Sequence, residues 1–370
     1  MRTVKFGDVV VRANTKEDRY NTDRLYYVGG EHMDTGEYLI TKRGLIEGST
    51  IGPMFYFGFK KGQVLLASRS PDLKKAGMVT FDGICSEKTF VIETRDEKVL
   101  LQTYLPFIVR SERFWQYAND NQSGSVNHFI NWSTFAAYEF ELPSIEEQAE
   151  IAAKGWAMVE LRDAYRSLIT ATDEMVKSQF IEMFAKKKTV PLIEFATVCA
   201  GQSAPSDTEF SSTGTPFIKA GNLENLKLGI IEEKQCNLVS PSVVAKRKLK
   251  LQKAGSVLVA KSGMSCLSGH IYALKEDAYV VSHLACIRAK VDAYAEMVKW
   301  FFIISGTKAL IKNPSYPAIQ IPQFENMEFP MANQDEAEAF ATIAKQSDKS
   351  KFEIEAAISK INNMLRALTK

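Results

Sequence analysis

Histidine and cysteine are the side chains in this chain best suited to bind a metal or to act as nucleophiles. The histidines are His32, His128, His270 and His283, and none has metal-ligand spacing to a cysteine. We therefore expect no structural zinc. The cysteines are Cys85, Cys199, Cys236, Cys266 and Cys286. An odd number of cysteines without a CxxC pair is typical of ordinary free thiols in a reducing cytosol, which is what we expect here.

Three short motifs suggest catalysis or nucleotide binding. NPSY (313–316) differs by one residue from the NPPY loop of amino-methyltransferases, but no glycine-rich cofactor turn follows a strand with an acidic residue downstream. GSVLVAKS (255–262) resembles a P-loop but has Ala260 where glycine must precede the lysine. Pro71-Asp72 with Asp96–Lys98 forms only a loose nuclease pattern. We expect none of the three to be catalytic, and NPSY to form a turn.

Composition and charge are those of a globular protein of two domains. The chain has 370 residues, 45% of them hydrophobic, and a net charge of +2. Residues 1–144 carry 18 basic and 18 acidic side chains, and residues 189–330 carry 15 and 12. Charge alone does not indicate nucleic acid. No apolar run is long enough to span a membrane, and the first residues do not resemble a secretory signal, so we expect a cytoplasmic protein.

The sequence repeats itself at an offset near 190 residues. INWSTFAAYEFELP (130–143) aligns with IQIPQFENMEFPMA (319–332), and Glu146–Glu147 align with Asp335–Glu336. Upstream, KKGQVLLAS (60–68) resembles KAGSVLVAK (253–261). A repeat of this length indicates a duplicated domain rather than a solenoid.

Each half begins with short apolar alternations and ends with a long helix. Segments such as QVLLAS, FVIET, SVLVAKSG and ACIRA predict strands, and residues 100–120 and 297–312 predict helices. We therefore predict an α+β fold with two mostly-β globular domains and two long antiparallel coiled-coil helices, a tandem repeat with a pseudo-two-fold axis. The predicted segments are a domain at 1–144, a helix at 145–188, a domain at 189–331 and a helix at 332–370.

Heptad spacing predicts which residues pair the two helices. A repeat of 3.5 residues places apolar side chains on one seam, which calls for a partner helix. The alternative is that each stripe packs on its own domain. The predicted seam residues are Ile151, Met158, Leu161, Tyr165, Leu168, Met175, Ile354, Ile358, Ile361, Leu365 and Leu368. Two helices of about 40 residues would form a spacer of about 60 Å.

Three phrases resemble the specificity (S) subunits of type I restriction–modification systems. They are YVGGEHMDTGE (27–37), VNHFINWSTFAAYEFELPSIEEQAEIA (126–152) and MVKSQFIEMF (175–184), and the resemblance extends over the tandem arrangement of the whole chain. The second half matches less well, since FPMANQDEAEAF lacks the second proline and the Glu-Gln pair.

The resemblance implies a DNA-specificity subunit that catalyses nothing. Its two target recognition domains would each read one half of a split site in double-stranded DNA. Its coiled coil would set the distance between the half-sites and dock two methyltransferase (M) subunits. S-adenosylmethionine would bind in the M subunits and no cofactor in this chain, with restriction (R) subunits as an optional further partner.

Candidate DNA contacts follow from residue chemistry and loop placement. Arginine can read guanine, asparagine can read adenine, and lysines contact phosphates. The alternative for a solitary lysine is a solvated surface charge. In the first half the candidates are Arg69, Lys74, Lys75, Asn127 and His128. In the second half they are Lys246, Arg247, Lys248, Lys261, Ser262 and His270.

Two other function classes remain open from the sequence. One is a DNA adenine methyltransferase or a fused restriction enzyme, against which the missing cofactor turn counts. The other is a coiled-coil adaptor that binds protein and no DNA, which the near-neutral charge favours. A salt titration separates the adaptor from a DNA-binding protein, because phosphate contacts make affinity fall steeply with salt.

Overall fold

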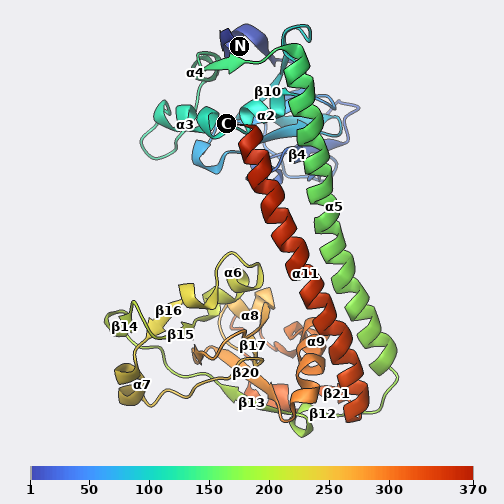
Figure 1. Ribbon diagram of the computed structural model, residues 1–370, viewed down its shortest axis with the longest axis vertical. Coiled ribbons are helices and arrows are strands. Elements are labelled where there is room, and N and C mark those ends of the chain that lie inside the picture. The colour runs from blue at the N-terminus through green and yellow to red at the C-terminus, as the bar shows by residue number, and fades with distance from the viewer. Residues whose placement is uncertain (1, 370) are drawn as a thin grey trace. The chain divides into compact units, whose positions relative to one another are not determined.

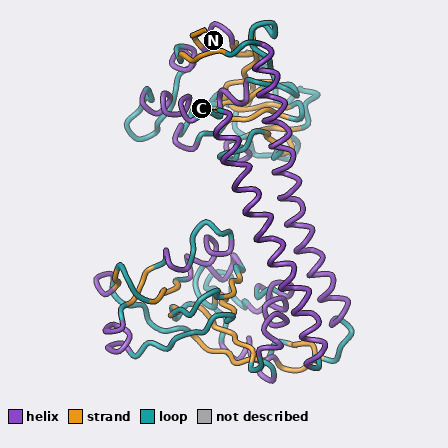
Figure 2. Tube along the Cα trace, viewed as in Figure 1, coloured by secondary structure: helices purple, strands orange, loops and turns teal. Residues whose placement is uncertain are grey.

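The computed structural model describes residues 2–369 and forms two compact units. Unit 1 comprises Met1–Ser167 and Ile354–Lys370, and unit 2 comprises Leu168–Glu353. The long helices α5 (Ile145–Phe184) and α11 (Gln334–Leu368) each contribute to both units (Figure 1). The strands lie in the globular part of each unit (Figure 2).

Unit 1 is built on two sheets and a short ribbon. Its strands are β1 (Arg2–Lys5), β2 (Val10–Ala13), β3 (Tyr26–Val28), β4 (Leu39–Ile40), β5 (Gly44–Leu45), β6 (Phe55–Phe59), β7 (Val64–Ala67), β8 (Ala76–Val79), β9 (Gly83–Ser86), β10 (Thr89–Thr94) and β11 (Glu139–Leu142). The sheet orders are β2-β10-β7-β8-β4, β5-β3-β9-β6 and β1-β11. Its short helices are α1 (Phe6–Val9), α2 (Leu105–Val109), α3 (Glu112–Asp120) and α4 (Trp132–Ala136), with 3-10 turns η1 (Gly30–His32) and η2 (Pro71–Leu73).

Unit 2 repeats this plan. Its strands are β12 (Thr189–Pro191), β13 (Ala196–Ala200), β14 (Phe210–Ser211), β15 (Thr215–Ile218), β16 (Asn237–Val239), β17 (Val257–Ala260), β18 (Ile271–Ala273), β19 (Tyr279–Val280), β20 (Leu284–Ala289) and β21 (Glu328–Pro330). The sheet orders are β13-β20-β17-β18, β14-β16-β15-β19 and β12-β21. The helices are α6 (Leu223–Lys227), α7 (Pro241–Arg247), α8 (Ser265–Ser268), α9 (Ala295–Ser305) and α10 (Ile321–Glu325). The 3-10 turns are η3 (Leu192–Glu194), η4 (Asp207–Glu209), η5 (Ala220–Asn222), η6 (Glu233–Gln235), η7 (Asp292–Tyr294) and η8 (Lys308–Leu310).

Strand pairing shows that the two units are copies of one topology. The run β2-β10-β7-β8 in unit 1 corresponds strand by strand to β13-β20-β17-β18 in unit 2. In the second sheet, β3 pairs in parallel with β9 as β15 does with β19. The ribbon β1-β11 corresponds to β12-β21. The duplication predicted from the sequence is therefore present in the hydrogen-bonded architecture.

The predicted strands and helices lie where the apolar patterns placed them, with two differences: the helix predicted at 297–312 ends at Ser305 as α9, and the interval 100–120 is divided. The helical interval 100–120 is two helices, α2 and α3. The break falls at Ser111, whose backbone is extended and whose hydroxyl accepts a hydrogen bond from the amide of Phe114 at 3.2 Å. Serine satisfies an orphan amide at a helix start, so this residue begins a new helix rather than continuing the old one.

Both long helices begin with the same capping geometry. In α5 the amide of Glu147 donates to the Ser144 hydroxyl, and the amide of Ser144 donates to the Glu147 carboxylate. In α11 the amide of Glu336 donates to the Asn333 side chain, and the amide of Asn333 donates to the Glu336 carboxylate. These residues lie 189 positions apart in the sequence. Both long helices therefore begin with a capping box at equivalent positions of the repeat, which satisfies two backbone amides at each helix start.

Stretches of α5 and α11 pack together in each unit. In unit 1, Val159 of α5 lies in one apolar cluster with Ile361 and Leu365 of α11. In unit 2, Phe180 and Phe184 of α5 stack edge to face on Phe340 of α11, with ring centroids 5.3 and 5.7 Å apart. Also in unit 2, Lys351 of α11 donates to Asp173 of α5 at 2.6 Å. Between this contact and that of Phe340 with Phe180, the residue number rises along α11 and falls along α5. The pairing there is antiparallel.

The heptad seam predicted for α5 is wrong at three positions. Leu161, Leu168 and Met175 are 46%, 47% and 49% exposed. The buried stripe lies one position along, through Ala152, Gly155, Val159, Arg162, Val176, Phe180 and Phe184. This stripe includes a glycine, where an added Cβ would lie 2.2 Å from the Phe107 ring, and an arginine. A search for apolar residues at heptad spacing does not count glycine or arginine, so it identified the neighbouring stripe instead.

The other seam residues lie on the buried sides of their helices. Ile151, Met158 and Tyr165 of α5 are half-buried, and Met158 and Tyr165 pack against the Val159 cluster. In α11, Ile361 and Leu365 are buried, and Ile354, Ile358 and Leu368 are half-buried. The stripe of α11 contains only apolar residues over this stretch, which is why its spacing could be recognised.

A buried glutamine fixes the start of α5 to the globular part of unit 1. Gln148 is fully buried. Its Oε1 accepts a hydrogen bond from the amide of Leu101 at 3.0 Å, and its Nε2 donates to the carbonyls of Val99 and Pro143, both at 3.0 Å. Three backbone groups thus depend on one side chain for their hydrogen bonds.

Replacing Gln148 with alanine should lower the free energy of unfolding by about 2–3 kcal/mol, because buried backbone groups lose their partners. Chemical denaturation of the full chain measures this. Glu150→Ala is the matched control two residues away, since exposed Glu150 pairs with exposed Lys154 and its loss should change the free energy by less than about 0.5 kcal/mol. Equal effects of both substitutions would contradict the role of Gln148.

Candidate nucleic-acid interface

The loop after β7 (residues 68–75) is held in a strained conformation. The turn η2 is flanked by Ser70 and Lys74, with φ angles of 49° and 48°. Left-handed backbone costs a residue with a Cβ about 1 kcal/mol, so surrounding contacts must hold it. The Thr35 hydroxyl donates to the carbonyl of Leu73 at 2.7 Å, and Arg110 Nη1 donates to the carbonyl of Lys74 at 2.6 Å. Strain of this kind is typical of functional loops.

The three predicted cations of this loop have different surroundings. Lys74 forms an ion pair with Glu112, and Lys75 Nζ donates to the carbonyl of Gly30 at 2.6 Å. Arg69 is exposed, and no described residue accepts a hydrogen bond from its guanidinium group. Arg69 is therefore the cation of the loop that can bind a ligand without breaking a hydrogen bond, although its charge helps to lower the pKa of Glu87.

A second loop, residues 122–129, lies beside the first. Arg69 pairs with Phe129 in an antiparallel bridge, and the amide of Ser70 donates to the carbonyl of His128 at 3.1 Å. The side chains of Asn127 and His128 are exposed. The structure thus brings Arg69, Asn127 and His128 to one edge of unit 1. We call residues 68–75 and 122–129 the unit 1 loop pair.

Unit 2 contains an equivalent pair of loops, residues 261–270 and 312–318, which we call the unit 2 loop pair. Ser262 pairs with Ala318 as Arg69 pairs with Phe129. The amide of Gly263 donates to the carbonyl of Pro317 at 3.0 Å, as Ser70 does to His128. The amide of Ile319 donates to Lys261 at 2.7 Å, as Ile130 does to Ser68 at 2.8 Å. The predicted equivalence of the loops after β7 and β17 is confirmed by these hydrogen bonds.

The predicted side chains of the unit 2 loop pair are less free than those of unit 1. Lys261 and Ser262 are half-buried, and the Ser262 hydroxyl lies 2.7 Å from Nδ1 of His283. His270 Nε2 lies 3.7 Å from the Glu224 carboxylate. These side chains therefore help to fix the conformation of the loop as well as being available to a ligand.

Two exposed side chains of the unit 2 loop pair were missed from the sequence. Tyr316 is 82% exposed and Met264 is 69% exposed. Tyr316 stands 189 positions after Asn127, so the repeat offset was the signal that could have identified it. Met264 had no such signal. Tyr316 lies within NPSY, which forms an exposed turn, as expected.

The basic segment of unit 2, residues 245–250, is partly neutralised by one carboxylate. Glu209 accepts hydrogen bonds from Lys246 at 3.0 Å and from Arg247 Nε at 2.9 Å. The Arg247 guanidinium, with smaller contributions from Ser206 and Lys246, holds the pKa of Glu209 well below its usual range. Lys248 ends α7 with a φ of 52°, and its carbonyl accepts a hydrogen bond from Gln202 at 3.1 Å. Lys246 and Arg247 are therefore paired cations, unlike Arg69.

An exposed thiol lies beside this basic segment. Cys199 of β13 pairs in register with Cys286 of β20. The hydrogen bond with the Cys286 thiol, helped by nearby Lys250, lowers the pKa of Cys199 to about 7. Burial raises the pKa of Cys236 to about 11 and that of Cys85 to about 12. Cys199 is therefore the cysteine with most thiolate character at neutral pH.

Neither a metal-binding cluster nor a membrane-spanning helix occurs among the described residues. None of them forms a group of three or more histidine, cysteine or acidic side chains that could hold a metal ion. No helix among residues 2–369 is long and apolar enough to cross a membrane.

Comparisons with known proteins identify the fold. No family model and no curated protein matches the chain. A chain from a structural study of complex assembly and conformational transition of the type I R-M system aligns over 100% of this chain and 96% of its own, with a TM-score of 0.57 and 16% identity. The type I restriction–modification S subunit from M. genitalium aligns over 100% and 95%, with a TM-score of 0.59 and 11% identity. The predicted α+β fold and the resemblance to S subunits are confirmed at the level of the fold.

Iodoacetamide should alkylate Cys199 before the other cysteines, because about half of this thiol is ionised at pH 7 when its pKa is about 7. Peptide mass spectrometry after brief labelling of the full chain identifies the modified residue. Labelling should slow as the pH is lowered to 6. A Cys199→Ser variant should lose the fast phase, and first labelling of Cys85 or Cys236 would contradict the assignment.

Proposed function

We propose that this chain is the non-catalytic DNA-specificity subunit of a type I restriction–modification complex. The observation that carries the proposal is the duplicated loop pair on a fold shared with a type I S subunit over the whole chain. A duplicated binding surface suits a ligand with two separate elements. A bipartite site in double-stranded DNA is such a ligand.

In this proposal residues 1–144 and 189–331 are the two target recognition domains. Unit 1 reads its half-site with Arg69, Asn127 and His128, whose donors suit guanine and adenine edges in the major groove. Unit 2 uses Lys261, Ser262 and His270 with the exposed Tyr316 and Met264. The DNA phosphates are contacted by Lys74, Lys75, Lys246, Arg247 and Lys248. When DNA binds, Lys246 and Arg247 break their ion pairs with Glu209 and pair with phosphates instead.

The long helices (145–188 and 332–370) set the distance between the half-sites and dock two M subunits. Leu168 and Met175, with Leu161 seven residues earlier, are exposed at heptad spacing on α5, although α11 covers another stripe. An apolar heptad stripe suits a helix of a partner. S-adenosylmethionine and the methyltransferase chemistry belong to the M subunits in this proposal, and restriction (R) subunits are optional partners.

Salt titration tests DNA binding by this chain in complex with the M subunit encoded beside it. We expect the logarithm of the affinity for duplex DNA to fall linearly with the logarithm of the salt concentration, because phosphate contacts release counterions. Affinity independent of salt, or no binding, would favour a protein adaptor instead.

Arg69→Ala tests base recognition within the same assay. We expect affinity for cognate DNA to fall about tenfold or more, while affinity for random duplex falls much less, because a bidentate arginine–guanine contact contributes about 1–3 kcal/mol of discrimination. Lys5→Ala removes an exposed cation of β1 outside the loop pair and serves as the control. Equal losses on both DNAs would make Arg69 a phosphate contact only.

A further inference from the structure

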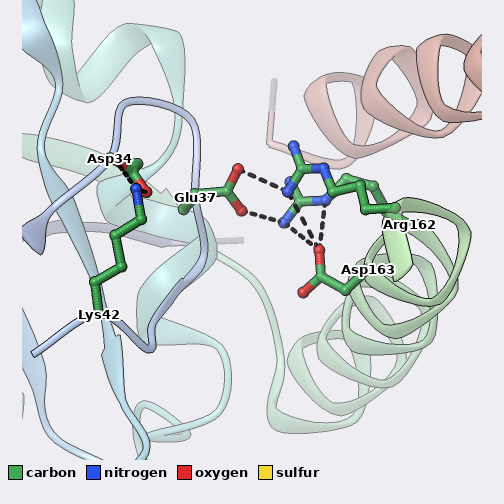
Figure 3. A network of polar contacts seen from close by, with 6 residues as sticks. Asp34, Glu37, Lys42, Arg162 and Asp163 are labelled. Carbon is green, nitrogen blue, oxygen red and sulfur yellow. Dashed lines mark hydrogen bonds and ion pairs between the residues drawn. The ribbon is translucent and has the colours of Figure 1, made fainter. Parts of the chain in front are cut away.

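A buried arginine of α5 contacts the segment that supports the unit 1 loop pair. Arg162 is 2% exposed, and its Nη2 lies 2.5 Å from Oε2 of Glu37 (Figure 3). Arg166, one turn along α5, donates to Oε1 of the same carboxylate at 2.8 Å. Two arginines of the helix thus bind one carboxylate of the globular part. A buried arginine needs such a partner, since an unpaired buried charge is strongly destabilising.

Glu37 belongs to residues 30–38, which comprise η1 and the segment from η1 to β4 and also hold the strained loop 68–75. From this segment Thr35 donates to the carbonyl of Leu73 at 2.7 Å, and the carbonyl of Gly30 accepts from Lys75 at 2.6 Å. The segment therefore contacts α5 at Glu37 and the loop at Thr35 and Gly30.

A second connection runs through Tyr38. Its ring is buried, with the guanidinium carbon of Arg162 6.0 Å from the ring centroid and that of Arg110 5.7 Å from it. Arg110 donates at 2.6 Å to the carbonyl of Lys74, the left-handed residue that ends η2. Displacing Arg162 would therefore disturb both supports of the loop that presents Arg69.

Unit 2 has a different arrangement at the equivalent helical position. Lys351 of α11 stands 189 positions after Arg162. Its Nζ lies 2.6 Å from Asp173 of α5 and 2.9 Å from Asp348, which lies one turn earlier in its own helix. No described residue of the unit 2 loop pair contacts it. Both halves have a paired cation here, Arg162 buried and Lys351 half-buried, but only Arg162 is connected to a loop pair.

From these contacts we infer that Arg162 is a positioning residue for DNA specificity, which fixes the unit 1 loop pair to helix α5 through Glu37. The inference rests on the proposed function for its DNA consequence, but the positioning itself is a property of the free chain. Arg162 touches no DNA in this account. It acts by holding the loop in the strained conformation that aims Arg69.

Hydrogen–deuterium exchange tests the positioning without DNA. In Arg162→Met we expect the amides of residues 68–75 to exchange about tenfold faster than in the natural chain, with residues 261–270 unchanged. The Arg162→Met/Glu37→Gln double variant should exchange more slowly than the two single effects added together, because both substitutions remove the Arg162–Glu37 pair, although Glu37→Gln also weakens the pair with Arg166. Lys351→Met is the matched control and should leave both loop pairs unchanged. Unchanged exchange at 68–75, or faster exchange throughout unit 1, would overturn the inference.

Selection from a randomised duplex pool tests the consequence for specificity, with this chain in complex with its M subunit. For Arg162→Met we expect selectivity at one half-site to fall about tenfold and selectivity at the other to be kept, whereas Lys351→Met keeps both. Loss at both half-sites, or no change at either, would overturn the specificity role. If the natural complex selects no bipartite site, the proposed function fails, while the exchange result still decides the positioning.

Discussion

Burial of one stripe on each long helix is the constraint on which both units depend. In unit 1 the stripe of α5 at Val159 shares its apolar cluster with Ile361 and Leu365, which come from the far end of the sequence. In unit 2 the aromatic rings of Phe180 and Phe184 close the core against Phe340. Each compact unit therefore contains a stretch of both helices; unit 2 is one contiguous segment, Leu168–Glu353, whereas unit 1 also needs the end of α11 from the far end of the sequence. A helix stripe of this kind is stable only when a partner covers it.

The duplicated architecture separates support from recognition. The backbone hydrogen bonds that join the two loops of each pair are the same in both units, so the pairing of the loops is a property of the shared backbone. The exposed side chains differ: Arg69, Asn127 and His128 in unit 1, and Met264 and Tyr316 in unit 2. One scaffold with two sets of side chains suits a protein that recognises two different elements with the same geometry.

The sequence predicted most of the fold because its main signals are local. Apolar alternation located the strands of both sheets, and the aligned acidic residues Glu146–Glu147 and Asp335–Glu336 lie in the first turns of α5 and α11. The seam of α5 was misplaced because its buried stripe includes Gly155 and Arg162, which no apolar pattern registers.

Partners distant in the sequence could not be predicted. Arg162 and Glu37 are separated by 125 positions, and Glu209 pairs with Arg247 across 38. For the same reason the sequence could indicate which loops carry the candidate DNA contacts but not which side chains have ion-pair partners. The structure was needed to show that Arg69 is exposed and that Arg247 is paired with Glu209.

Genome-wide mapping of methylated adenines tests the central claim most directly. This chain would be co-expressed with the M subunit encoded beside it, and methylation would be mapped by single-molecule sequencing. The account predicts a split motif of two short defined blocks around a fixed gap, which disappears when this chain is deleted. Methylation that is absent, or that persists unchanged without this chain, would contradict the account.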